Sequence, residues 1–354
     1  MREKKKSYKI GKYRLEIQFY KMEQCSTIMV DGSWVLLALI EVAIAVIITY
    51  LITPLLIRGL KTNGVTGVDV HKIERPVRAE MCGLGAVLGS IIAFLTLSMI
   101  IGLTIKTIAF VVVILLTSAI GVYDDLQGMR QRHKVILLFI ASLPLAFALQ
   151  DRQTIFLPFI GLTTVGIFYP LILVPIGISA ASNLTNMLAG FNGLEAGVGS
   201  IALGGVAVVS LMFGRWESFW IALPMAVAFG TFLFFNWYPA EAFPGDAGTL
   251  VIGSTIACAV IVGQLEIFGI WLLVPHITDF LLKILGARGR HFEQRNVFGD
   301  TQITNEGILC PPSYLALSHL LMNLAPMTEP KLVRALLTCE GFFVVTAIAI
   351  SIWW

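Results

Sequence analysis

Charged side chains are scarce in this chain of 354 residues, since Asp, Glu, Lys and Arg make up only 13% of it. That share is about half of the share in a typical soluble domain. Hydrophobic residues make up 57% of the chain, and the mean hydropathy is +0.84. A chain of this composition cannot cover a globular surface with polar groups. The shortage of charge therefore excludes an ordinary soluble domain and a disordered chain, and it indicates a polytopic membrane protein.

Paired cysteines are also absent, because the five cysteines are scattered and form no CxxC pair. This spacing excludes a disulfide framework and a zinc site of the usual kind. The chain has no Walker A run, no GxSxG elbow and no HExxH helix. It has no basic patch with interleaved aromatic residues, so we expect no nucleic-acid partner.

The apolar residues fall into segments that are long enough to cross a bilayer. Backbone polar groups in lipid must be satisfied within each segment, so these segments should be helices. We therefore predict an all-α, polytopic membrane protein with about ten transmembrane helices. The predicted spans cover about 33–57, 81–103, 107–123, 134–150, 167–187, 194–213, 218–237, 249–264, 267–285 and 332–354.

Segment 309–326 is also apolar, but it contains Pro311, Pro312, His319 and Asn323. We predict that it is interfacial or partly embedded and does not span the membrane. The predicted domain organisation is a basic tail over 1–32, followed by a single integral membrane domain over 33–354.

Basic residues between the predicted spans are distributed unequally between the two faces. One face has three, Lys106, Arg152 and Arg215, and the other has fourteen. The positive-inside rule places the richer face in the cytoplasm and both termini outside. The eight basic residues of 1–30 would then lie outside, so either the true start is Met29 or the tail is an exception to the rule. The fourteen are Arg58, Lys61, Lys72, Arg75, Arg78, Arg130, Arg132, Lys134, Lys283, Arg288, Arg290, Arg295, Lys331 and Arg334.

Four polar segments gather on the predicted cytoplasmic face, where polar groups at the membrane are costly and usually functional. The first is GVYDDLQGMRQRHKVILL, residues 121–138. Asp124 and Asp125 could hold Mg²⁺ or position a proton acceptor, and Lys134 is a point charge suited to a phosphate. The alternative is a charged turn that caps two spans.

The second segment is SNLTNMLAGFNGLEAG, residues 182–197. It places Asn183, Asn186 and Asn192 near glycines at the end of a span. Amide oxygens are acceptable Mg²⁺ ligands, asparagines pair well with nucleobase edges, and glycines let the backbone approach a ligand. The alternative is a simple Gly/Asn turn.

The third segment is NWYPAEAFPGDAGT, residues 236–249. Asp246 lies between Gly245 and Gly248, just before a predicted helix. A carboxylate in a glycine turn is typical of a metal or phosphate site. The alternative is that Asp246 is an ordinary helix N-cap.

The fourth segment is the loop GARGRHFEQRN, residues 286–296. The guanidinium groups of Arg288, Arg290 and Arg295 suit a pyrophosphate, and His291 can hydrogen-bond a sugar. The alternative is ordinary cytoplasmic charge.

His276 and Asp279 lie one turn apart in the preceding span, where they pair with each other or line a cavity, and we assign them no catalytic role.

Taken in this order, the four segments resemble those of the polyprenyl-phosphate N-acetylhexosamine-1-phosphate transferases, glycosyltransferase family 4. The resemblance runs from about residue 53 to 300. Asp124-Asp125 with Arg132-His133-Lys134 resembles the aspartate-pair motif of the family, and NMLAGFNGLEAG and NWYPAEAFPGDAG resemble its next two motifs. The last loop is nearer to the dolichol-type enzymes of archaea and eukaryotes, although Phe292 replaces the second Arg of their Arg-His-Arg pattern.

The resemblance implies transfer of GlcNAc-1-phosphate from UDP-GlcNAc to dolichyl or polyprenyl phosphate, which releases UMP and starts lipid-linked oligosaccharide synthesis for N-glycosylation. It implies attack by the lipid phosphate, a hydrophobic groove for the isoprenoid, and Mg²⁺, with Mn²⁺ as a substitute. It also implies an archaeal plasma membrane or an ER membrane, and family members often form homodimers. Alternatives are another UDP-N-acetylhexosamine, cell-surface polysaccharide synthesis, or, more distantly, a secondary transporter with polar groups at the midplane.

The resemblance also assigns roles to individual residues. Asn186 and Asp246 are the expected metal ligands. Asp124, Asp125 and Lys134 are the expected catalytic residues, with Lys134 holding the lipid phosphate and Asp125 orienting or deprotonating the acceptor. Asn192 is expected to contact uracil and Phe243 to stack on it. The expected substrate-binding residues are Glu80, Asn183, Asn192, Phe243, Arg290, His291 and Arg295.

Overall fold

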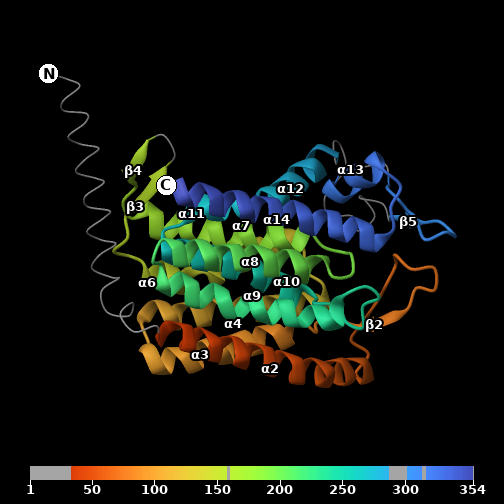
Figure 1. Cartoon of the computed structure of the whole chain (residues 1–354), viewed down its shortest axis with the longest axis horizontal. Coiled ribbons are helices and arrows are strands. Elements are labelled where there is room, and N and C mark those ends of the chain that lie inside the picture. The colour runs from red at the N-terminus through yellow and green to blue at the C-terminus, as the bar shows by residue number, and fades with distance from the viewer. Residues whose placement is uncertain (1–32, 158–159, 287–300, 313–315, 354) are drawn as a thin grey trace.

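The structure is a computed structural model that describes residues 33–157, 160–286, 301–312 and 316–353. Long helices lie side by side along one direction, from α2 and α3 at one edge of the bundle to α12 and α14 at the other (Figure 1). The helices are α2 (Ser33–Thr62), α3 (Leu84–Ile101), α4 (Ile105–Gln127), α5 (Gln131–Ala141), α6 (Leu143–Ala148), the π-helix η1 (Tyr169–Leu173), α7 (Val174–Met187), α8 (Leu194–Met212), α9 (Trp216–Asn236), α10 (Asp246–Gly263), α11 (Glu266–Leu272), α12 (Val274–Gly286), α13 (Leu317–Leu324) and α14 (Glu329–Trp353).

Three short antiparallel hairpins project from the ends of the bundle. They pair β1 (Thr66–Val68) with β2 (Val77–Ala79), β3 (Thr154–Leu157) with β4 (Gly161–Thr164), and β5 (Gln302–Ile303) with β6 (Leu309–Cys310). The β3–β4 hairpin lies at one end of the bundle, and β2 and β5 lie at the other (Figure 1).

The predicted number of spans is confirmed. Within the described residues, nine helical stretches are long and apolar enough to cross a membrane, or ten if α11 and α12 form one span. The span predicted over 267–285 is bent by 58° between α11 and α12. In the described part of the segment predicted to be interfacial, the only helix is α13, whose eight residues are too short to cross a bilayer. The N-terminal tail lies outside the described residues.

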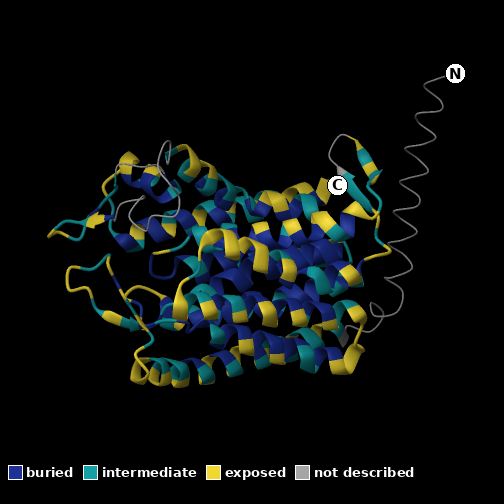
Figure 2. Ribbon diagram, turned by 180° about the vertical axis from the view of Figure 1, so that it is seen from behind, coloured by how far each residue is buried: buried dark blue, intermediate teal, exposed yellow. Residues whose placement is uncertain are grey.

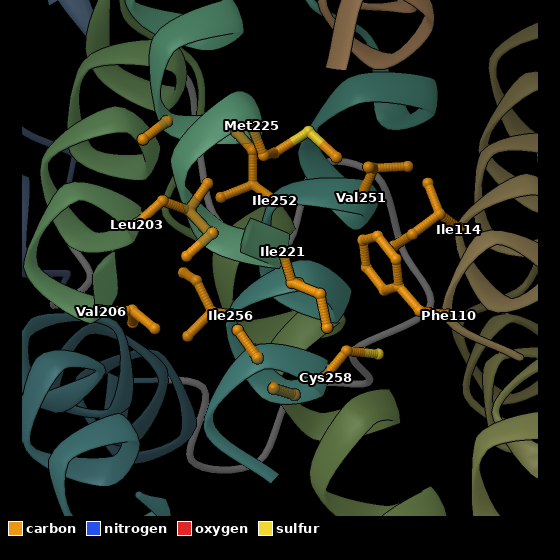
Figure 3. Packing of buried hydrophobic residues seen from close by; sticks show 14 of the residues in the cluster. Phe110, Ile114, Leu203, Val206, Ile221, Met225, Val251, Ile252, Ile256 and Cys258 are labelled. Atoms are coloured by element: carbon orange, nitrogen blue, oxygen red, sulfur yellow. The ribbon is translucent and has the colours of Figure 1, made fainter. Parts of the chain in front are cut away.

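Helix α10 lies at the centre of the bundle, packed against α4, α7, α8 and α9. In its most apolar stretch 94% of the residues are buried, compared with 17% in α2. Many large apolar residues of the outer helices are exposed, as expected for a surface that faces lipid. The ribbon of these helices is coloured largely as exposed or intermediate in Figure 2. Figure 3 shows the packing around α10, whose Val251, Ile252, Ile256 and Cys258 meet Phe110 and Ile114 of α4, Leu203 and Val206 of α8, and Ile221 and Met225 of α9.

Small residues allow the helices around α10 to approach closely, as is common in membranes. Gly121 of α4 is the clearest case, because an added Cβ atom would lie 2.5 Å from the carbonyl oxygen of Asp246. This contact brings the last turn of α4 against the first turn of α10. The fold thereby places the Asp124–Asp125 pair beside Asp246.

Candidate active site

Lys134 lies between two carboxylates at one end of the bundle. Its Nζ atom contacts Oδ2 of Asp124 and lies 2.6 Å from Oδ2 of Asp246. These side chains come from the first turn of α5, the last turn of α4 and the first turn of α10. The exposed fraction is 7% for Lys134 and 9% for Asp124, but 26% for Asp246. Asp246 is therefore the member of this group that an incoming ligand reaches most easily.

Asn186, in the last turn of α7, contacts the other oxygen of Asp246. Its Nδ2 donates to Oδ1 of Asp246 at 2.6 Å and to Oγ1 of Thr249 at 2.9 Å. The neighbouring Thr185 hydroxyl donates to the Thr249 carbonyl oxygen at 3.0 Å, which holds the end of α7 against α10. The two residues expected to ligate a metal are thus in direct contact.

The adjacent residues Asp124 and Asp125 have different partners. Asp124 contacts Lys134, and its Oδ1 accepts the Met129 backbone N–H at 2.5 Å. Asp125 accepts the backbone N–H groups of Asp246 at 2.8 Å and of Ala247 at 3.0 Å. The first N–H groups of a helix have no partner within the helix, and a carboxylate is favoured beside them. Asp125 therefore caps α10 from a neighbouring helix.

Asp246 does not itself cap α10. The N-cap residue of α10 is Gly245, which has no side chain to supply a cap, so the alternative that Asp246 is the N-cap is wrong. Gly245 has a φ of +65°, and an added Cβ would lie 2.6 Å from Oδ2 of Asp125. Glycine is needed here both for the backbone conformation and for the close approach of Asp125.

Glu80 and Phe243 lie next to each other beside strand β1. The backbone N–H of Phe243 donates to the Ala79 carbonyl oxygen at 2.8 Å, which pairs the two segments. A Cβ atom added at Gly67 of β1 would lie 3.2 Å from Cδ of Glu80 and 3.3 Å from Cδ2 of Phe243. Burial, and then the negative charge of Asp246, raise the pKa of the Glu80 carboxyl above its usual value. Both predicted substrate-binding residues therefore lie close to the group around Asp246.

Asn183 does not contact Asp246, although it lies one turn before Asn186 on α7. Its Oδ1 accepts from Nε2 of Gln131 at 2.7 Å, and its Nδ2 donates to the Ser179 carbonyl oxygen at 2.8 Å. Asn183 and Gln131 lie at the polar end of a groove between α5, α7 and α12.

This groove has a volume of about 850 Å³ and is lined mainly by apolar side chains such as Phe139, Ile176 and Phe280. Lys283 also lines it and contacts Asp279 at 2.7 Å and the Met187 carbonyl oxygen at 2.5 Å. The sequence predicted a hydrophobic groove beside the site, and the structure contains one.

His276 and Asp279 have separate partners rather than each other. Nδ1 of His276 lies 3.9 Å from Oε2 of Glu340. Asp279 pairs with Lys283 and accepts the Leu317 backbone N–H at 2.9 Å, which fixes the start of α13. The Asp279 hydrogen bond joins α12 to α13, and His276 faces Glu340 of α14.

Asn192 is held in the loop between α7 and α8 by two acidic residues that the sequence analysis missed. Its Nδ2 donates to Oδ2 of Asp69 at 3.0 Å, and its backbone N–H donates to Oε1 of Glu329 at 2.7 Å. Lys72 contacts both of these carboxylates. No motif marks these three residues, because they come from the β1–β2 loop and the start of α14.

The remaining candidates, Arg290, His291 and Arg295, lie outside the described residues. They follow α12 in the chain, and α12 ends near Met187 through the contact of Lys283. Their predicted contacts with the diphosphate and sugar stay predictions.

Comparison with known proteins identifies the same family as the sequence motifs. The model of the family Glycosyl transferase family 4 matches residues 107–264, which include Asp124, Asp125, Lys134, Asn186 and Asp246. A protein of Saccharolobus solfataricus, provisionally named a UDP-N-acetylglucosamine–dolichyl-phosphate N-acetylglucosaminephosphotransferase, is 30% identical over 90% of this chain and 98% of its own length.

Two further relatives come from other groups of organisms. A protein of Methanocaldococcus jannaschii, provisionally named a glycosyltransferase, is 34% identical over 81% of this chain and 88% of its own length. The UDP-N-acetylglucosamine–dolichyl-phosphate N-acetylglucosaminephosphotransferase of Dictyostelium discoideum is 26% identical over 63% of this chain and 62% of its own length. With its membrane-spanning helices, the chain belongs to glycosyl transferase family 4 as an integral, multi-pass membrane protein.

Proposed function

We propose that the protein transfers GlcNAc-1-phosphate from UDP-GlcNAc to dolichyl or another polyprenyl phosphate and releases UMP. One observation carries this proposal: helices α5 and α7 each place one residue in the polar group around Asp246 and another at the polar end of the apolar groove. On α5 these residues are Lys134 and Gln131, and on α7 they are Asn186 and Asn183. Residues three apart lie on the same face of a helix. A soluble nucleotide sugar and a lipid phosphate can therefore meet at this place.

The relatives support the same reaction. Two of them bear names that specify UDP-N-acetylglucosamine as donor and dolichyl phosphate as acceptor. The pathway that we infer is the first membrane step of lipid-linked oligosaccharide synthesis. The unequal distribution of basic residues favours a site on the cytoplasmic side of the membrane.

The residues around Asp246 suit a magnesium ion. Carboxylate and amide oxygens are ligands that Mg²⁺ prefers, and the ion commonly takes only one or two from the protein. Nδ2 of Asn186 donates to Asp246, so the amide would have to turn over to offer its oxygen to an ion beside this carboxylate. Asp246 is the most exposed carboxylate of the group. We propose that these two residues hold Mg²⁺, or Mn²⁺ as a substitute. When bound, the ion neutralises charge on the pyrophosphate.

In the proposed reaction, an oxygen of the lipid phosphate attacks the phosphorus that bears GlcNAc. A new P–O bond forms there, the P–O bond to the uridine phosphate breaks, and UMP leaves with the electron pair. A phosphomonoester has a second pKa of about 6 and is largely ionised near neutral pH. The acceptor therefore needs little help from a base, which fits an Asp125 whose oxygens are both engaged by α10.

Lys134 supplies positive charge where the two phosphates meet. An ammonium group has three N–H donors, and Asp124 and Asp246 occupy two of them. Among the described residues no other group accepts from Lys134, and we propose that the third N–H donates to a phosphate oxygen. Phosphoryl transfer depends mainly on such positioning and charge neutralisation. We propose that Phe243 stacks on the uracil and that Glu80 contacts the donor sugar.

The test is UMP release by purified protein in detergent, with Mg²⁺, dolichyl phosphate and either UDP-GlcNAc or UDP-GalNAc. We expect release from UDP-GlcNAc that needs both Mg²⁺ and the lipid. Release from UDP-GalNAc instead would retain the mechanism and change the donor, with Phe292 as the first residue to exchange. No UMP from either donor, with a protein that unfolds cooperatively on heating, would contradict the proposal.

A further inference from the structure

Lys72 joins four segments that are distant in the sequence. Its Nζ atom contacts Oε2 of Glu329, lies 3.3 Å from Oδ2 of Asp69, and lies 4.3 Å from the centre of the Tyr238 ring. Asp69 is 4% exposed and Glu329 is 3% exposed. Buried carboxylates are stable only when they are paired, so Lys72 makes this cluster possible. Asp69 and Glu329 in turn contact Asn192. The four segments are therefore the β1–β2 loop, the loop between α7 and α8, the segment around Tyr238 and the start of α14.

The same carboxylates could suggest a metal site. Asp69, His71 and Glu329 offer ligand atoms that all lie within 4.8 Å of one another. In the structure each of the two carboxylates has a lysine partner and an asparagine partner, since Lys72 contacts both and Asn192 donates to both. The cluster therefore acts as a support for Asn192.

The partners of Asn192 determine which way its amide faces. An ionised carboxylate accepts hydrogen bonds and cannot donate them. Oδ2 of Asp69 lies 3.0 Å from the amide, so the NH₂ group must face Asp69 and the carbonyl oxygen must face away. Glu329 holds the backbone N–H of Asn192 at 2.7 Å and fixes the same residue from a second side.

The carbonyl oxygen of Asn192 is open to a ligand. Within the described part of the chain, no residue donates to this oxygen, and the protein does not enclose it fully. Asn192 as a whole is only 3% exposed, and a carbonyl group in such surroundings is costly unless it meets a donor. The oxygen therefore suits a ligand that supplies an N–H or O–H group.

The β1–β2 hairpin links this oxygen to Phe243. Gly67 and Asp69 are two residues apart, and the Asp69 N–H continues the hairpin by donating to the Pro76 carbonyl oxygen. Residues two apart in a strand face the same side. Gly67 lies beside Phe243, and Asp69 contacts Asn192. The aromatic ring of Phe243 and the carbonyl oxygen of Asn192 thus lie along one side of the hairpin. A nucleobase needs such a pair, because it stacks on a ring and hydrogen-bonds through its edge.

We propose that Asp69, supported by Lys72 and Glu329, is a positioning residue that selects uracil over cytosine by fixing the amide of Asn192. The inference rests on the proposed function, since it concerns the base of the donor nucleotide. Uracil has an N–H at ring position 3, which can donate to the carbonyl oxygen of Asn192. Cytosine has a lone pair at that position, so two acceptors would face each other and a buried acceptor would lose its partner.

The experiment measures binding of UDP and of CDP to the full chain in detergent with Mg²⁺, by calorimetry. The wild-type protein should prefer UDP. In Asp69→Asn the new amide can donate or accept, so the Asn192 amide can turn over, and the preference for UDP should fall by about tenfold or more. With UDP-GlcNAc as substrate, this variant should raise KM more than it lowers kcat. Asp151→Asn, an exposed residue in another loop, is the matched control and should leave the preference unchanged.

A double variant tests the orientation itself. In Asn192→Asp two carboxylates face each other, and binding of UDP should weaken. Combining Asp69→Asn with Asn192→Asp restores one NH₂ donor facing a carboxylate and again presents an acceptor to the base. The double variant should therefore regain the preference for UDP, and it keeps the cluster paired if Asp69→Asn alone does not fold.

The possible results separate this inference from the proposed function. Wild-type protein that binds neither nucleotide would overturn both. A wild-type preference for UDP that persists in Asp69→Asn, or that the double variant does not regain, would overturn the role of Asp69 and leave the proposed function standing.

Discussion

Oδ1 of Asp125 accepts the backbone N–H of Asp246 at 2.8 Å. The neighbouring Asp124 is linked to the side chain of the same Asp246 through Lys134, which contacts both carboxylates. Asp124 and Asp125 are adjacent on α4, and the close contact at Gly121 brings both to the start of α10. The pair therefore has two tasks. Asp124 belongs to the charged group, and Asp125 fixes the position of Asp246.

The first prediction concerns Asp125. Asp125→Asn keeps one carbonyl acceptor for the start of α10 and should retain part of the activity, whereas Asp125→Ala removes both and should lose nearly all. Loss of a helix cap costs about 1 kcal/mol, so Asp125→Ala should also lower the melting temperature. UMP release and thermal unfolding measure the two effects. Equal and complete loss of activity in both variants, with unchanged melting temperatures, would instead indicate that Asp125 accepts a proton.

The second prediction concerns Asp246 and Lys134. Asp246→Ala removes the proposed metal ligand, and Lys134→Met removes the charge for the phosphates, so each should lower kcat by a factor on the order of 10² or more. UMP release by folded protein measures both. Lys106→Met is the matched control, because Lys106 pairs with Glu217 at the opposite end of α4. Normal activity of Asp246→Ala would remove the metal assignment.

The third prediction concerns the pH dependence of stability. Burial, and then the charge of Asp246, raise the pKa of Glu80 in the folded protein above 4.5. The folded state therefore binds the Glu80 proton more tightly than the unfolded state does, and stability falls as the pH rises from this ordinary value through the raised one. Glu80→Gln removes this dependence. Its melting temperature should rise relative to wild type between pH 5 and pH 8, and a difference that does not change with pH would contradict the assignment.

The fourth prediction concerns the groove. Ala180 lines it and is exposed, so Ala180→Trp should fill part of its volume. The KM for dolichyl phosphate should rise about tenfold, a cost typical of overpacking, while the KM for UDP-GlcNAc stays unchanged. Val208→Trp, on the exposed side of α8 and outside the groove, is the control. Equal changes in both KM values would argue against lipid binding here.

The sequence predicts the spans well for a physical reason. In lipid an apolar segment has to be a helix, so hydropathy alone places α2 to α10 and α14. The bend between α11 and α12 cannot be predicted from the hydropathy, because the apolar segment continues without a break through Leu273. The short length of α13 follows from the prolines and polar residues of its segment.

The candidate site was predicted only where residues form local motifs. Asp124, Lys134, Asn186 and Asp246 stand in such motifs, and the structure brings them together. The cap from Asp125 joins residues 121 positions apart and depends on packing at Gly121, which no local pattern records.

The cluster that holds Asn192 could not be predicted from the sequence for a similar reason. Lys72 and Glu329 are 257 positions apart, and Glu329 resembles an ordinary acidic residue in the first turn of a helix. Their relationship to Asn192 appears only when the β1–β2 loop, the α7–α8 loop and the start of α14 lie together.

Transfer of the phosphate together with the sugar distinguishes a phosphotransferase from an enzyme that moves the sugar alone. UDP-GlcNAc labelled with ³²P in the phosphate that bears GlcNAc is incubated with the purified protein, Mg²⁺ and dolichyl phosphate, and the lipid and aqueous phases are separated. The label should move into the lipid phase while unlabelled UMP appears in the water. Label that stays in the water as UDP, with only the sugar moved to the lipid, would contradict the proposed function.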